Sequence, residues 1–156
     1  MSGLESYARI TPFLWFDSNA EEAVEFYLTV FKNSRRLGEQ RWADDMVAPK
    51  GSIITVSFEL DGLQFTALNG GPYHKFTEAI SFVVRCDSQQ EIDEYWSKLT
   101  AEGTEIACGW LKDRFGVSWQ VVPARLAELI QHPNAMKAMM QMKKLDIAAL
   151  ERAAQS

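Results

Sequence analysis

Histidine, cysteine and basic residues are all scarce in this sequence. Its 156 residues include two histidines and two cysteines, Cys86 and Cys108, which are too few for the disulfide framework of a small secreted domain. Sixteen Lys and Arg residues stand against 21 Asp and Glu residues, which gives a net charge of −5. Since no basic stripe is present, nucleic acid is not expected as a partner.

Long hydrophobic runs are also missing. The apolar runs have the length of strands, far below the roughly 20 residues that a membrane-spanning helix needs, and residues 1–9 are too short and mixed for a signal peptide. We therefore expect no membrane partner and a reducing, cytoplasmic location. The length and the hydrophobic content of 47% suit a single domain, residues 1–156, because they allow a sizeable core.

A repeated pattern is the most informative feature that is present. An apolar run followed by Asp-Ser, with a Glu three residues after the Ser, occurs at residues 10–21 and again at residues 79–91; the two pairs are offset by 87 − 17 = 70 positions. Ser-x-x-Glu is a capping box that marks a helix start, so each copy predicts strand, cap and helix. An apolar stripe at helical spacing follows each box: Ala23, Phe26, Tyr27 and Val30, then Ile92, Tyr95, Trp96 and Leu99.

Further strands are expected after each helix. We expect them at 37–42, 52–60 and 63–68 in the first copy and at 105–108 and 117–122 in the second; residues 52–60 are rich in the β-branched side chains that strands prefer. Asp61-Gly62 is a hairpin signal, and residues 109–115 are interpreted as a loop. Aligning Gly62 with Gly116 places Phe65 opposite Trp119 and Thr66 opposite Gln120. Two β-α-β-β-β modules, about 8–73 and 78–123, follow from this alignment.

The remaining residues, 124–156, form a tail with helical patterning. A short apolar stripe at 126–130 is broken by Pro133; Asn134 is the expected cap of a helix that runs to Lys144, and Asp146 the expected cap of a helix at 147–154. The tail is rich in methionine, which fills irregular gaps in cores and subunit contacts. We interpret Met136, Met139, Met140 and Met142 in this way.

The doubled module resembles the vicinal oxygen chelate superfamily, which includes glyoxalase I, bleomycin-resistance proteins and extradiol dioxygenases. The closer resemblance is to its PhnB-like branch, labelled "3-demethylubiquinone-9 3-methyltransferase" domain, and four stretches carry it: 10–27, 65–72, 79–84 and 108–120. The resemblance implies an α+β fold in which two modules form a curled mixed sheet, a glyoxalase-like cup, followed by the helical tail. It also implies a small-molecule ligand in the cup and a homodimer.

Metal-using members of the superfamily place a His or Glu in the first strand of each module and a Glu near the end of each last strand. The matching windows here, residues 10–13 and 79–81, hold no imidazole or carboxylate, and the strand-end positions are the neutral Thr66 and Gln120. The two histidines lie outside these windows, and Glu78 is a lone carboxylate beside the second one. A catalytic metal site needs about three such ligands. We therefore expect no metal and no other cofactor.

Motifs for other chemistries are weak. No G-x-G-x-x-G pattern supports the methyltransferase label, and residues 69–72, Asn-Gly-Gly-Pro, are interpreted as a linker between modules. Ser118 lacks the second glycine of a nucleophile elbow. Cys108 would need a nearby cation, such as Lys112 or Arg114, to become a nucleophile. No catalytic residue is identified, so whether the protein is an enzyme stays open.

Aromatic residues on or beside the expected strands suggest a binding site, because small-molecule pockets are mostly apolar with a few fixed polar groups. The candidate substrate-binding residues are Trp15, Phe65, Asn69, Ser81, Phe82, Cys108, Trp110, Lys112, Trp119 and Gln120. Their alternative role is to fill the core between sheet and helix. The leading hypothesis is a protein that binds a small, partly apolar molecule without a catalytic metal. The alternatives are a metal-dependent enzyme of the glyoxalase or dioxygenase type and a sequestering protein of the bleomycin-resistance kind.

Overall fold

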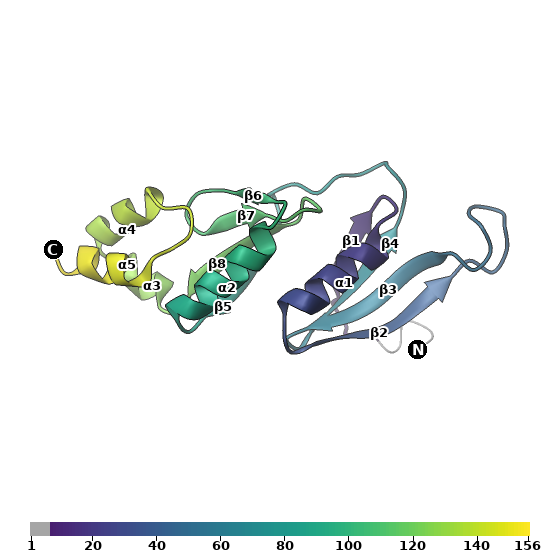
Figure 1. The fold of residues 1–156 in the computed structure, drawn as a ribbon, viewed down its shortest axis with the longest axis horizontal. Helices are drawn as coiled ribbons and strands as arrows, with labels where there is room; N and C mark the ends of the chain where they lie inside the picture. Colours follow the sequence, from purple (N-terminus) through teal and green to yellow (C-terminus); the bar gives the residue numbers. More distant parts are fainter. Residues whose placement is uncertain (1–6) are drawn as a thin grey trace. The chain divides into compact units, whose positions relative to one another are not determined.

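The computed structural model describes residues 7–156 (Figure 1). The chain divides into two compact units, and the boundary lies between Lys75 and Phe76. Each unit contains one copy of the repeated module, and the second also contains the tail. The single domain expected from the sequence stays a prediction. Among the residues that the structure describes, no helix is both long and apolar enough to cross a membrane.

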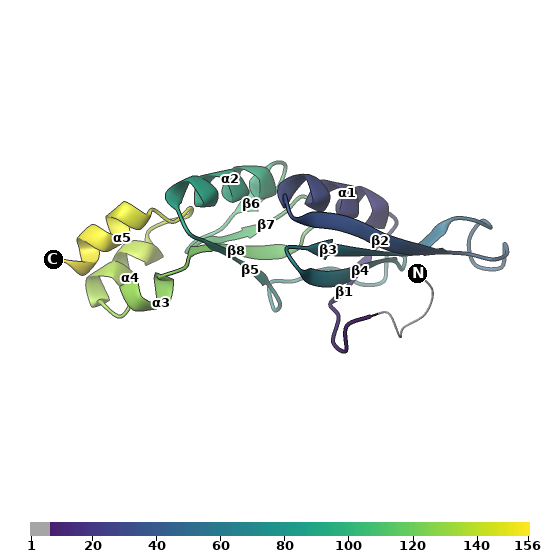
Figure 2. The ribbon, with the colours of Figure 1, turned by 90° about the horizontal axis from the view of Figure 1, so that it is seen from below.

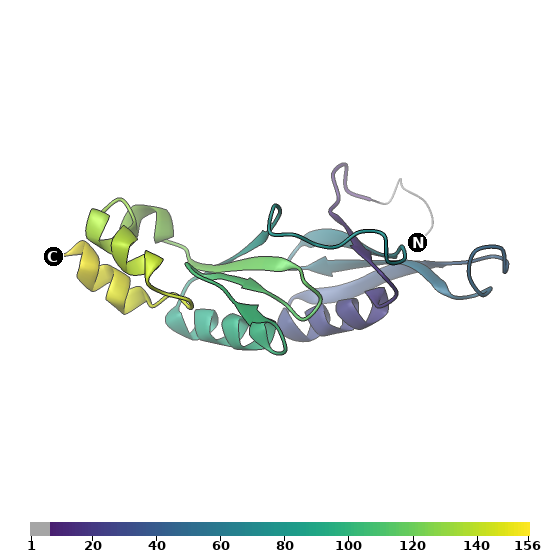
Figure 3. The same cartoon turned by 90° about the horizontal axis from the view of Figure 1, so that it is seen from above.

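The first unit is a sheet with one helix on it. Its elements are β1 (Phe13–Phe16), α1 (Ala20–Val30), β2 (Ser34–Arg41), β3 (Ile53–Leu60) and β4 (Leu63–Asn69). The strand order is β1-β4-β3-β2, with β1 parallel to β4 and the other neighbours antiparallel. Helix α1 covers one face of this sheet (Figures 2 and 3). We call the opposite face, which includes Trp15, Thr55, Ser57 and Thr66, the helix-distal face of the first sheet.

The second unit repeats this arrangement. Its elements are β5 (Phe82–Cys86), α2 (Gln89–Thr100), β6 (Thr104–Glu105), β7 (Trp110–Lys112) and β8 (Ser118–Pro123), and the strand order is β5-β8-β7-β6. The registers correspond as well. Phe13 lies beside Thr66 in one parallel pair and Val83 beside Gln120 in the other, so that 83 − 13 = 70 and 120 − 66 = 54. The predicted α+β fold with two β-α-β-β-β modules is confirmed.

Each core lies between helix and sheet. In the first unit the ring of Tyr27 on α1 stacks on Phe58, with centroids 6.2 Å apart, and Phe58 stacks on Phe65 at 5.3 Å. In the second, the α2 stripe of Ile92, Trp96 and Leu99 is buried, as are Leu111, Trp119 and Val121 on the sheet. Burying a large apolar side chain contributes about 1.5–3 kcal/mol, so these stripes hold the helices on the sheets.

Only the second capping box forms as the sequence predicts. The Glu91 N–H donates to the Ser88 hydroxyl at 3.2 Å, and Glu91 Oε1 accepts the Asp87 N–H at 2.9 Å. The prediction of the first capping box is wrong. Helix α1 begins at Ala20, and the side chain of its N-cap residue, Asn19, makes no capping bond. A side chain of β4 accepts the hydrogen bond at the start of α1 instead, because the fold brings together residues that are distant in sequence.

Several boundaries also differ from the expectation. Residues 110–112 form strand β7 and not a loop, because they pair with β8. Three residues are too few for this pairing to be recognised from the sequence. The expected strand at 105–108 is reduced to Thr104–Glu105. The first strand of each module begins late, at Phe13 and Phe82.

The tail forms α3 (Leu126–Leu129), α4 (Pro133–Met140) and α5 (Ile147–Ala154). Asp146 caps α5 as predicted, accepting the Ala149 N–H at 3.0 Å. The cap expected at Asn134 is wrong, because α4 starts at Pro133, a residue suited to the first helical position. The helix also ends before Lys144, since the Met142 and Lys143 carbonyls accept the N–H groups of residues 108 and 109.

A small core attaches the tail to the second unit. Val122 of β8 is buried with Leu129, Leu145 and Leu150, and other side chains pack around them, including Met139 and Met142. The packing role expected for the methionines is thus observed for these two, whereas Met140 is exposed.

Candidate functional site

Strand alternation separates the candidate binding residues into two groups, because successive side chains point to opposite faces of a sheet. One group faces the helices: Phe65, Asn69, Phe82 and Trp119. The other lies on the helix-distal faces: Trp15 in the first unit, and Trp110, Lys112 and Gln120 in the second, with Ser81 bonded to Gln120. Cys108 lies in the loop before β7.

Phe65 and Trp119 belong to the cores. They are 2% and 3% exposed, at the corresponding positions that the sequence alignment gave them. The Trp119 ring packs on Phe82, with centroids 5.4 Å apart, and its indole N–H donates to Asp113 Oδ2 at 2.8 Å. These positions favour the alternative in which such aromatics fill the core.

Asn69 works as the cap of α1. Its Oδ1 accepts the Ala20 N–H at 2.9 Å, and its amide donates to the Ile53 carbonyl at 3.3 Å. The two residues that follow also bond to the segment before α1: the Gly70 and Gly71 N–H groups donate to the Phe16 and Asp17 carbonyls at 2.8 and 3.0 Å. Residues 69–71 therefore stabilise the β1–α1 turn. The N–H groups of Gly70 and Gly71 donate to carbonyls of this turn and do not bind a cofactor phosphate.

Trp15 is half-buried on the helix-distal face of the first sheet. Its indole N–H donates to the Gly71 carbonyl at 2.9 Å, and the His74 ring meets it edge-on at 4.7 Å. Gly70 lies so close that a Cβ there would come 2.3 Å from Trp15 Cε2. The ring is thus fixed by backbone contacts on one side.

The helix-distal face of the second sheet brings four candidates together. Trp110 and Gln120 are partners in the β7–β8 ladder, and Lys112 is the next residue of β7 on the same face, roughly 7 Å along the strand. The Gln120 amide donates to the Ser81 hydroxyl at 3.0 Å. All four side chains are partly exposed. We call Ser81, Trp110, Lys112 and Gln120 the β7–β8 site.

A charge pair borders the β7–β8 site. Lys112 Nζ lies 3.0 Å from Glu78 Oε2, and the hydrogen bond from this ammonium, followed by the backbone and the charge of Lys112, lowers the pKa of the Glu78 carboxyl. Glu78 is the one carboxylate beside the window, residues 79–81, that matches a ligand position of metal-using relatives. It is paired with a cation instead, and Lys112 remains able to meet an anion because its side chain is about one-third exposed.

Cys86 is not set up as a nucleophile. Cys86 is 1% exposed, and burial, followed by the charges of Glu91 and Asp87, raises its pKa to about 12. Cys108 has a positive φ of 61° and is held by its N–H, which donates to the Met142 carbonyl at 2.9 Å. Ser118 is buried on β8.

Sequence reasoning missed Asp113, a carboxylate only 3% exposed. Its Oδ1 accepts the N–H groups of Phe115 and Val117 at 2.8 and 3.1 Å, and its Oδ2 accepts the indole of Trp119. It thereby organises the β7–β8 turn that ends at Gly116, where φ is +89°. The Asp-x-x-Gly spacing is the signal that could have found it.

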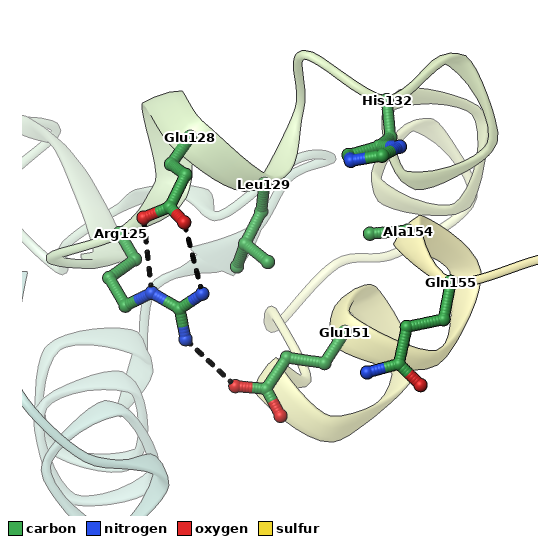
Figure 4. Close-up of a pocket in the computed structure, with 7 residues that line it drawn as sticks. All are labelled: Arg125, Glu128, Leu129, His132, Glu151, Ala154 and Gln155. Atoms are coloured by element: carbon green, nitrogen blue, oxygen red, sulfur yellow. Dashed lines mark hydrogen bonds and ion pairs between the residues drawn. The ribbon is translucent and has the colours of Figure 1, made fainter.

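A hollow in the tail was also missed. Its volume is about 390 Å³, and Figure 4 shows its lining: Arg125, Glu128, Leu129, His132, Glu151, Ala154 and Gln155. Arg125 is engaged by Glu128 at 3.2 Å and by Glu151 at 3.3 Å. The bond to Glu128 raises the pKa of the guanidinium and lowers that of the carboxyl. These groups are exposed, so the pairs add little stability.

Comparison with known proteins places this fold in a family. The family described as 3-demethylubiquinone-9 3-methyltransferase matches residues 8–122, which is most of the chain. The chain belongs to this family. None of the curated proteins matches the chain.

Solved structures agree with this assignment. A PhnB protein from Bacillus cereus with the same family description is 33% identical, with a TM-score of 0.68, covering 75% of this chain and 100% of its own. A glyoxylase/bleomycin resistance protein/dioxygenase domain from Frankia shares 14% identity, with a TM-score of 0.50 and coverage of 78% and 95%. FosX, a fosfomycin resistance protein from Listeria monocytogenes crystallised with Mn(II) and sulfate, shares 14%, with a TM-score of 0.54 and coverage of 80% and 96%. This protein therefore lies in the PhnB-like branch of the vicinal oxygen chelate superfamily.

The side chains of this family member do not fit the metal that metal-using relatives hold. Thr66 and Gln120, at the strand-end positions, lie beside Phe13 and Val83, none of which is an ionisable ligand. Within residues 7–156, no group of three or more His, Cys, Asp or Glu side chains is arranged to hold a metal ion.

Proposed function

We propose that this protein binds a small, partly apolar anion at the β7–β8 site, without a catalytic metal. The observation that carries the proposal is the convergence of an indole, an ammonium and an amide on one sheet face: Trp110 is the ladder partner of Gln120, with Lys112 beside them. An apolar surface with a few oriented polar groups is what small-molecule sites provide.

Each side chain has a distinct role in this proposal. Trp110 offers a ring face to the apolar part of the ligand. Lys112 meets the negative charge, exchanging its exposed partner Glu78 for the ligand. Gln120 is oriented by its bond to Ser81, which leaves its amide oxygen to accept from a polar group of the ligand.

Phenylacetate and its neutral counterpart phenylacetamide test the proposal. Titrated calorimetrically into the full-length protein, phenylacetate is expected to bind at least fivefold more tightly, because only it pairs with Lys112. Trp110→Ala should weaken phenylacetate binding about tenfold, the equivalent of about 1.4 kcal/mol, and Lys112→Gln should remove the preference for the anion.

Two control variants belong to this experiment. Lys98→Gln makes the same charge change at an exposed position of α2 and should leave binding unchanged. Trp119→Ala should lower thermal stability, while the fraction that folds still binds. Equal binding of both compounds, or an unaltered preference in Lys112→Gln, would contradict an anion site here.

The two alternatives make different predictions. A metal-dependent enzyme would contain stoichiometric zinc, nickel or iron after purification without chelator, and such a result would overturn the proposal. A sequestering protein would bind its ligand tightly and release it unchanged, which mass spectrometry of the recovered ligand can detect. The proposal leaves open whether a reaction follows binding.

We also propose that the protein is a cytoplasmic homodimer. The proposal rests on the family resemblance, together with exposed apolar residues at corresponding places in the two modules, Ile10 with Ile80 and Phe13 with Val83, each offset by 70. Exposed apolar side chains that recur in this way are typical of contact surfaces. Light scattering during size-exclusion chromatography should give twice the chain mass of 17.7 kDa, and a monomer would contradict it.

A further inference from the structure

The C-terminal tail contains the hollow of about 390 Å³ that Figure 4 shows. Its lining residues all lie between positions 125 and 155, whereas the family match ends at residue 122. The hollow is therefore formed by a part of the chain that the family match does not include, and all of it belongs to the second unit.

Two helices of the tail supply most of the lining. Glu128 and Leu129 belong to α3, Glu151 and Ala154 belong to α5, and Gln155 is the C-cap residue of α5. Leu129 is 4% exposed and is part of the small core of the tail, against which Ala154 also packs. These two side chains give the hollow an apolar floor below a charged rim.

The charges of the rim leave one negative charge in excess. Glu128 and Glu151 carry two negative charges, and Arg125, which pairs with both, carries one positive charge. Arg125 Nη1 donates to Glu151 Oε1 at 3.3 Å, a bond that leaves Oε2 of this carboxylate able to accept from a ligand. The hollow also lies at the C-terminal end of α5, where the helix carbonyls attract positive charge. Both features favour a cation.

An organic ammonium suits this lining better than a metal ion. Among residues 7–156, no three His, Cys, Asp or Glu side chains are arranged as metal ligands. On the side of the hollow away from Arg125, Figure 4 shows His132 and Gln155. An imidazole and an amide can both exchange hydrogen bonds with a hydroxyl group. The lining thus matches an ammonium and a hydroxyl joined by a short hydrocarbon chain.

We propose that the hollow between α3 and α5 binds a short aliphatic amino alcohol as its ammonium ion. Glu151 Oε2 accepts from the ammonium, the hydrocarbon chain covers Ala154 and Leu129, and the hydroxyl bonds to His132 and Gln155. Arg125 already holds the Glu151 carboxylate, so this acceptor is oriented before the ligand arrives. The site is separate from the β7–β8 site, which takes an anion, and does not depend on it.

5-Aminopentan-1-ol is the probe, and pentane-1,5-diol is its uncharged counterpart, in which a hydroxyl replaces the amino group. Each is titrated into the ¹⁵N-labelled full-length protein at pH 7.5 and low salt. Saturable amide shifts are expected at Leu129, Ala154 and Gln155. The amino alcohol should bind about threefold more tightly than the diol, because only the ammonium pairs with a carboxylate at this exposed rim.

Glu151→Gln keeps the size of the side chain and removes its charge, so it should abolish the preference for the amino alcohol over the diol. Because the pair with Arg125 is exposed, this variant should fold, and its ¹⁵N spectrum outside the tail should match that of the unaltered protein. Glu22→Gln makes the same change at an exposed position of α1 and should keep the preference.

Three results would overturn the proposal: no saturable shifts in the tail, equal binding of the two probes, or a preference that persists in Glu151→Gln. Tighter binding of the anion 5-hydroxypentanoate than of the amino alcohol would overturn it as well. Phenylacetate binding, followed in the same samples, reports on the β7–β8 site separately.

Discussion

Trp119 and Asp113 form a buried hydrogen-bonded pair at the turn between β7 and β8. The indole N–H donates to Asp113 Oδ2 at 2.8 Å, and both side chains are 3% exposed. The same carboxylate accepts two backbone N–H groups of the turn. A carboxylate that satisfies three donors in the interior fixes the strand ends on which Lys112 and Gln120 stand.

Replacing Asp113 should therefore destabilise the second unit. Asp113→Ala leaves three donors without their acceptor, and we expect a loss of about 3 kcal/mol in the free energy of unfolding. Asp113→Asn should cost less, since one oxygen still accepts while its amide nitrogen faces the indole N–H. Chemical denaturation measures both, and equal stability of Asp113→Ala and the unaltered protein would contradict the role assigned here.

Asn69 should prove to be the cap of α1, although it lies 49 residues from Ala20. Asn69→Ala removes the acceptor and should lower stability by about 1 kcal/mol. Asn69→Asp loses the bond to the Ile53 carbonyl, but it keeps an acceptor and places a negative charge at the positive end of the helix, so it should cost less. Asn19→Ala is the matched control, because the side chain at the formal N-cap makes no capping bond; a larger loss there than at Asn69 would refute the assignment.

Gly70 should tolerate no side chain while Trp15 keeps its place. A Cβ would lie 2.3 Å from the indole, so Gly70→Ala should cost about 1–3 kcal/mol through displacement of the ring. The shift should also appear as a change in Trp15 fluorescence. In a Trp15→Leu background the same substitution should cost much less, and a double-mutant cycle without coupling would rule out the contact.

Burial of Cys86 should make stability depend on alkaline pH. Its pKa is about 12 in the folded protein against 9.0 for an ordinary thiol, so the unfolded chain loses this proton first. Stability should then fall as pH rises from about 9 towards 12, by up to roughly 1.4 kcal/mol per pH unit from this group.

Other groups titrate in that range, so the measurement is the difference between the unaltered protein and Cys86→Ala in denaturation series at pH 8, 9.5 and 10.5. The slope should be smaller in Cys86→Ala. Identical slopes in the two proteins would show that the buried thiol does not contribute.

Much of the fold was accessible from local patterns. The offset of 70 between the Asp-Ser pairs, the stripes of α1 and α2 and the Asp61-Gly62 turn predicted the doubled module, because amphipathic period and turn chemistry act within a few residues. The alignment of Phe65 with Trp119 was correct for the same reason. Strand β7 was missed, since three residues with one inward side chain carry too little periodicity to be distinguished from a loop.

The site divides differently between sequence and tertiary structure. By itself, the sequence determined that neutral residues, Thr66 and Gln120, stand where metal-using relatives carry ligands, because residue type needs no coordinates once the register is known. Only the tertiary structure decided which aromatics are core, placing Trp119 against α2 and Trp110 on the other face. It also decided that Asn69 caps α1. Both depend on pairing between segments about 10 to 50 residues apart, and contacts at that separation are set by packing and not by local pattern.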